Sequence, residues 1–118
     1  MTDGAVTAIV PHDEVLLIAV RKRTLNAAST EALTDAIQEA AADRPGVPIV
    51  IDLAQVKFAP SVALGALVQT TKSFSMTGRR IALIGVDLRV LEAIAVTHLD
   101  RILEIHRTLE AFLKRPRP

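Results

Sequence analysis

Short apolar segments and longer amphipathic segments alternate along the chain. Runs rich in apolar and β-branched residues predict strands at 5–10, 14–20, 48–53, 81–86 and 102–106. Apolar residues spaced three or four positions apart predict helices between these runs, at about 26–44, 61–76, 87–99 and 108–115. The element order is therefore β-β-α-β-α-β-α-β-α.

The ends of the predicted helices carry recognisable signals. Asn26 or Ser29 can cap the first helix, Pro45-Gly46 ends it, and Asp87 can cap the third. The apolar stripe expected on the first helix is Ala32, Leu33, Ala36, Ile37, Ala40 and Ala41. On the third helix, Val90, Leu91 and Ile94 are expected to face the core.

This order predicts an α/β fold with a mixed β-sheet. The turn-like "PHD" at 11–13 joins the first two strands into an antiparallel hairpin. Strand–helix–strand units cross over right-handed, so the central strands are expected to be parallel, with about four helices packed on the sheet. We expect residues 1–118 to form a single domain, and the basic tail 114–118 to be frayed.

Parallel strands place their carboxyl ends, and the loops that follow, along one edge of the sheet. Functional sites of such sheets favour that edge. The loops expected there carry Arg21-Lys22-Arg23, Pro60-Ser61 and Gly85-Val86-Asp87.

Composition narrows the possible functions. Half of the 118 residues are apolar, the net charge is +1, and the chain has three Phe but no Trp, Tyr or Cys. The lack of Cys excludes disulfides and thiolate chemistry, and the weak charge and few aromatics argue against a nucleic-acid partner. No apolar run approaches the roughly 20 residues of a membrane span, so we expect a soluble cytoplasmic domain without membrane insertion.

The residues needed for catalysis or cofactor binding are not assembled in the sequence. It lacks a Gly-rich phosphate loop, and His12, His98 and His106 do not have the spacing of metal ligands. Glu104 and His106 would share one face of a strand, which is more typical of a surface pair than of a catalytic one. We therefore expect no catalytic residues, no metal and no cofactor.

Ser61 is the most informative single residue. At the start of a helix after Pro60, its hydroxyl is expected to cap the first turn. A phosphate there would add about −1.5 to −2 charges while the helix N-terminus tolerates it. Phosphorylation would then alter binding of a partner and leave the fold intact. The basic Arg21 and Arg23 indicate either a solvated loop or a contact to an anion or acidic partner.

The segments "IVIDLAQVKFAPSVALGALVQ" and "LRVLEAIAVTHLDRILEIHRTLEAFL" resemble STAS domains, the module of anti-sigma factor antagonists and sulfate transporters. The resemblance implies a regulatory domain that binds an anti-sigma factor with serine kinase activity, and it places the phosphorylated Ser at Ser61. Pro60, Val62 and Ala63 stand where the family has Asp, Ser and Gly, and His98 replaces another Gly. The expected partner contacts are Pro60, Ser61, Val62, Ala63 and Ala66, with Arg21 and Arg23.

Two other functions stay open beside this one. The domain could be a STAS module without a phosphorylation switch, in a signalling scaffold or as an accessory to a transporter. It could instead be a small enzyme or a nucleotide-binding domain that uses Arg21, Arg23 and Ser61, although no general base or metal ligand stands near Ser61 in the sequence. Homodimer formation is also left open.

Overall fold

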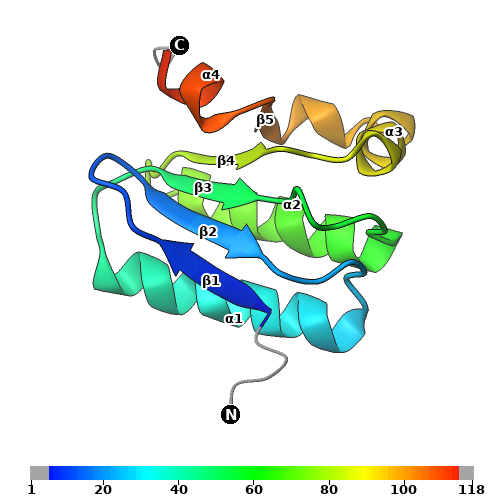
Figure 1. The fold of residues 1–118 in the computed structure, drawn as a ribbon, viewed down its shortest axis with the longest axis horizontal. Coiled ribbons are helices and arrows are strands. Elements are labelled where there is room, and N and C mark those ends of the chain that lie inside the picture. The colour runs from blue at the N-terminus through cyan, green and yellow to red at the C-terminus, as the bar shows by residue number, and fades with distance from the viewer. Residues whose placement is uncertain (1–5, 115–118) are drawn as a thin grey trace.

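A five-stranded mixed sheet organises the protein, as seen in a computed structural model that describes residues 6–114. The strands lie in chain order: β1 (Thr7–Val10), β2 (Leu16–Val20), β3 (Ile49–Asp52), β4 (Ile81–Ile84) and β5 (Glu104–His106). β1 pairs with β2 antiparallel, and the remaining neighbours are parallel (Figure 1). This confirms the predicted fold class.

In the described part of the chain, four α-helices connect or follow the strands: α1 (Ala27–Asp43), α2 (Ser61–Ser75), α3 (Leu88–Val96) and α4 (Leu109–Lys114). Asn26, not Ser29, caps α1, and its side-chain oxygen accepts the Ser29 N–H at 2.8 Å. Asp87 caps α3 as predicted, accepting the Arg89 N–H at 2.9 Å. Lys114 is still helical, and residues 115–118 of the predicted tail lie outside the described residues.

The third helix is shorter than predicted. α3 ends at Val96, and a 3₁₀ turn, η1 (Leu99–Arg101), follows it. His98 lies between them in the left-handed conformation, with φ of 60°. A left-handed residue cannot continue a right-handed helix, so the pattern that predicted a helix to residue 99 overran the helix end.

Both faces of the central strands are buried. Ile18, Ile51 and Leu83 are neighbours across the sheet and pack against α1, α2 and α3. On the opposite face, Val50 and Ala82 belong to a smaller cluster around Phe112 of α4. Figure 1 shows α1 and α2 on one side of the sheet and α4 beside β5. Burial on two faces explains why β3 and β4 read as continuous apolar runs.

The buried face of α1 is narrower than its apolar residues suggested. Leu33, Ile37 and Ala41 are buried at four-residue spacing, whereas Ala32 is exposed. Ser29 and Thr30 are buried instead, in the first turn. Alanine is small enough to lie on either face, so apolar character alone misplaced Ala32.

A polar cluster of Arg80, Glu104 and His106 packs against Phe112 and stabilises the contact between α4 and the sheet. The Arg80 guanidinium donates to Glu104, with Nε 2.9 Å from Oε1, and His106 Nε2 lies 2.7 Å from Glu104 Oε2. Arg80 also stacks on the Phe112 ring at 4.0 Å, and the His106 ring meets the same ring edge-on at 5.6 Å. The cluster confirms that Glu104 and His106 share a face, and it joins β5, α4 and Arg80, the residue before β4.

This cluster predicts a pH dependence of stability. Burial opposes ionisation of Glu104, but hydrogen bonds from Arg80 and His106 outweigh it and lower the pKa of Glu104 below its usual value. The ionised carboxylate therefore stabilises the fold above the unfolded pKa of about 4.3, and this contribution is lost as pH falls through the lower folded pKa.

Glu104→Gln should lower the free energy of unfolding at pH 7 by about 1–3 kcal/mol, because Arg80 loses its ionic partner. Urea denaturation between pH 5 and pH 3 should show a shallower fall in stability for this variant than for the wild type. Asp87, whose pKa is also lowered, titrates in both proteins, so the difference isolates Glu104. Parallel pH curves for the two proteins would contradict the assignment.

Candidate protein-docking site

Three loops and the start of a helix meet at the carboxyl ends of the parallel strands. In the register of the sheet, Ala19 lies beside Asp52 and Asp52 beside Ile84, so β2, β3 and β4 end together. The loops that follow are 21–26, 53–60 and 85–87, and α2 begins at the end of the second. We call these loops, with the first turns of α2 and α3, the rim. In Figure 1 the rim lies at the right-hand end of the sheet.

Main-chain hydrogen bonds join the basic loop to the loop before α2. The Arg23 carbonyl accepts the N–H groups of Lys57 at 2.7 Å and Phe58 at 3.0 Å. Leu25 N–H in turn donates to the Phe58 carbonyl at 3.1 Å, and Thr24 forms an isolated parallel bridge with Phe58. The predicted proximity of the basic triplet and Ser61 therefore has a structural cause. Arg23 is bonded to a segment that lies three residues before Ser61.

Side chains hold the other two loops in place. Asp52 Oδ1 accepts the Ala54 N–H at 2.9 Å, and Lys57 Nζ lies 3.2 Å from Asp87 Oδ2. The backbone hydrogen bond from Arg89 and the side-chain hydrogen bond from Lys57 lower the pKa of the Asp87 carboxyl. Each carboxylate at the rim thus has a local structural role.

Ser61 does not cap α2, which corrects the sequence prediction. The N-cap is Pro60, whose backbone is extended, and no side-chain cap accepts a hydrogen bond from the N–H groups of the first turn. Ser61 is the first helical residue, and the Pro60 carbonyl accepts the N–H groups of Ala63 and Leu64. A cap must lie outside the helix, and the helix begins one residue too early for Ser61 to act as one.

The predicted partner contacts are mostly accessible. Pro60, Ser61 and Val62 are exposed, as are Arg21 and Arg23, and Ala66 is half-buried. Ala63 is fully buried, so it was wrongly placed on the contact surface. It begins the core-facing side of α2, which continues through Leu64 and Leu67.

The rim also exposes three large apolar side chains: Val62, which the sequence analysis named as a partner contact, and Phe58 and Leu88, which it did not. Phe58 is 54% exposed, Val62 67% and Leu88 69%. The Arg89 guanidinium lies 5.8 Å from the centre of the Phe58 ring, which joins the start of α3 to this surface. Phe58 could have been recognised as an exposed apolar residue, because it lies in a loop outside any periodic apolar pattern. Leu88 gave no such signal, because its spacing fits a buried helix face.

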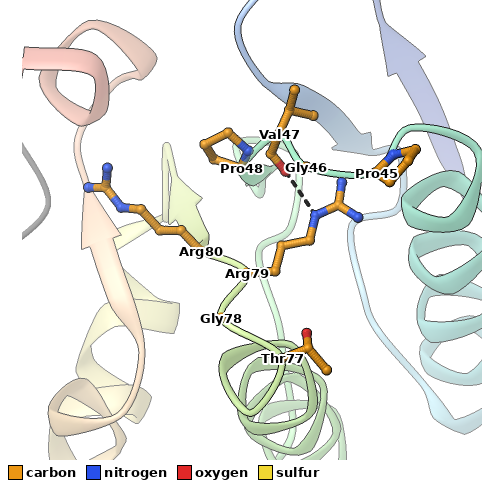
Figure 2. Close-up of a pocket in the computed structure, with 8 residues that line it drawn as sticks. All are labelled: Pro45, Gly46, Val47, Pro48, Thr77, Gly78, Arg79 and Arg80. Atoms are coloured by element: carbon orange, nitrogen blue, oxygen red, sulfur yellow. Dashed lines mark hydrogen bonds between the residues drawn. The ribbon is translucent and has the colours of Figure 1, made fainter.

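A pocket also lies at the opposite end of the strands. This pocket of about 420 Å³ is formed by residues 45–48, before β3, and 77–80, before β4. Figure 2 shows Arg79 directed toward Val47 and Arg80 directed away from it. Arg79 donates to the carbonyls of Val47, Ala41 and Arg44. Its guanidinium therefore satisfies carbonyl groups at the end of α1 and is not available to a ligand.

Within residues 6–114, no group of three or more His, Asp or Glu side chains is arranged to hold a metal ion. No helix in the same range combines the length and apolar character needed to cross a bilayer.

The fold and the rim define an α/β domain with an exposed helix start at the carboxyl ends of its parallel strands. The STAS domain family matches residues 7–112, so the chain belongs to this family. A TM1081 homologue of Thermotoga neapolitana, assigned as an anti-sigma factor antagonist, is 35% identical over 66 residues. The match covers 56% of this chain and 58% of that protein. The chain therefore matches little more than half the length of this curated relative.

Solved structures extend the similarity over most of the chain. An anti-sigma factor antagonist from Mycobacterium paratuberculosis is 28% identical, with a TM-score of 0.78 over 91% of this chain and 89% of that one. TM1081 of Thermotoga maritima, assigned the same role, is 25% identical, with a TM-score of 0.74 over 92% and 90%.

The rim geometry predicts the effect of a side chain at Gly85. This residue has φ of +64°, and an added Cβ would lie 3.0 Å from Asp52 Oδ1. Gly85→Ala should lower the free energy of unfolding by about 1–3 kcal/mol and displace Asp52. Gly46→Ala is the matched control, because Gly46 has φ of +89° but open space around it. Thermal unfolding should show a larger loss for the Gly85 variant, and equal losses would count against the Asp52 contact.

Proposed function

We propose that this protein is an anti-sigma factor antagonist that binds an anti-sigma factor through the rim. The observation that carries the proposal is the exposed start of α2, with Pro60, Ser61 and Val62 accessible, in a chain of the STAS family. The assignments of the relatives from Thermotoga and Mycobacterium support the same role. The protein would act as a cytoplasmic binding module and would catalyse no reaction of its own.

Regulation of this binding is proposed to act through phosphorylation of Ser61 by a serine kinase, the anti-sigma factor itself. The hydroxyl belongs to an exposed residue in the first turn of a 15-residue helix. A helix N-terminus stabilises negative charge, so the fold would tolerate a phosphate there. The same phosphate would place about −1.5 to −2 charges beside the exposed Val62, where a docked partner would have to desolvate them.

An alternative is constitutive docking without a switch, in a signalling scaffold or beside a transporter. The exposure of Phe58 and Val62 favours this alternative, because apolar side chains can be buried by a partner whatever the state of Ser61.

Ser61→Asp should weaken binding to the purified anti-sigma factor of the source organism by about tenfold or more, because an interfacial charge left unpaired costs at least the 1.4 kcal/mol that this factor represents. Ser61→Ala should bind like the wild type. Ser73→Asp is the matched control, since Ser73 is also exposed on α2 but lies near its other end. Isothermal titration calorimetry gives the affinities.

Equal binding by Ser61→Asp and the wild type would remove the switch and leave constitutive docking. Lack of binding by the wild type to any purified anti-sigma factor of its host would refute the antagonist function itself.

A further inference from the structure

Charge is segregated in this molecule, although its net charge is only +1. α1 carries Glu31, Asp35, Glu39 and Asp43 at four-residue spacing and contains no basic residue. The basic residues at the carboxyl ends of the strands are Arg21, Lys22, Arg23, Lys57, Arg89 and Arg107. A partner approaching the rim therefore meets a predominantly positive surface.

The rim's own carboxylates leave most of this charge uncompensated. Asp87 pairs with Lys57, and Asp52 Oδ1 accepts a main-chain N–H. Among residues 6–114, the ion pairs do not include Arg21, Arg23 or Arg89. Guanidinium groups can bind carboxylates in bidentate fashion.

Exposed apolar side chains belong to the same loops and helix starts as these cations. Phe58 is bonded through its main chain to Arg23 on one side, and its ring lies 5.8 Å from the Arg89 guanidinium on the other. Val62 follows in the first turn of α2, and Leu88 precedes Arg89. An exposed aromatic ring beside an arginine has the composition of the energetic centre of many protein interfaces.

We propose that the rim binds an acidic protein surface whose carboxylates surround apolar side chains. The carboxylates would pair with Arg21, Arg23 and Arg89, while the apolar side chains would cover Phe58, Val62 and Leu88. This inference rests on the proposed function, since it names the chemistry of the partner at the same site. Charge complementarity selects this partner over a basic or uncharged one, because like charges facing each other across an interface are repelled.

The same arrangement links partner choice to Ser61. A phosphate on Ser61 would add negative charge to the basic rim and compete with the partner's carboxylates for the arginines. The switch would then act by neutralising the surface that attracts the partner, in addition to repelling the partner directly.

The test uses two synthetic peptides and the ¹⁵N-labelled 118-residue chain. One 14-residue peptide alternates Asp or Glu with Leu and Phe, and the other has Lys at every acidic position. Amide shifts in NMR titrations should change with the acidic peptide at 21–25, 57–62 and 85–89, and should not change with the basic one. Raising NaCl from 50 to 300 mM should weaken the acidic peptide's binding at least threefold, since exposed charges are screened.

Charge-reversal variants identify the surface. Arg21→Glu with Arg23→Glu and Arg89→Glu should weaken binding of the acidic peptide at least tenfold. Lys72→Glu with Arg101→Glu and Lys114→Glu changes the net charge equally at exposed positions away from the rim, and it should keep the affinity within about twofold of wild type.

Equal weakening by both triple variants, or shifts spread over the whole protein, would overturn the proposal. So would shifts of the rim and of 31–43 that depend on protein concentration alone, because the occupant would then be α1 of a second copy. The peptides contain no anti-sigma factor, so these outcomes are independent of whether the antagonist function holds.

Discussion

The main-chain bonding between residues 23–25 and 57–58 is the constraint on which the rim depends. Without it, the basic loop after β2 and the loop before α2 would be two independent surface segments. The two N–H groups that share the Arg23 carbonyl, and the return bond from Leu25 to Phe58, fix one loop against the other. Because backbone hydrogen bonds do not depend on side-chain identity, substitutions at the rim can change its side chains while the two loops keep their relative position.

The sheet provides the frame for that constraint. β2, β3 and β4 are parallel and in matched register, so their carboxyl ends deliver three loops to one place. Apolar side chains on both faces of β3 and β4 fix the register, since a shift by one residue would exchange their two buried faces. At the opposite end of the strands, Arg79 donates to carbonyls at the end of α1. The Arg80–Glu104–His106 cluster contacts Phe112 of α4. The polar side chains at that end stabilise the fold, whereas the rim exposes polar and apolar side chains to solvent.

Element order, strand pairing and two helix caps could be predicted from the sequence because each depends on local signals. The apolar runs of β3 and β4 are typical of strands buried on both faces, and Asn26 and Asp87 are strong capping residues. The errors arose where a shift of one position along the helix decides whether a residue is the cap or whether its side chain is buried. Ser61 lies one position inside the cap, and Ala63 lies on the buried side of the same turn. Phe58 and Arg89 are 31 positions apart, so only the fold reveals their contact.

Amide hydrogen exchange of Leu25, Lys57 and Phe58, followed by NMR at neutral pH, tests the central constraint most directly. The account predicts exchange for these three amides at least a hundredfold slower than in an unstructured peptide, in contrast to the free N–H of Ser61 at the start of α2. Exchange at the rate of an open loop would show that the two segments are not bonded in solution, and the rim would then lack the fixed shape that a docking surface requires.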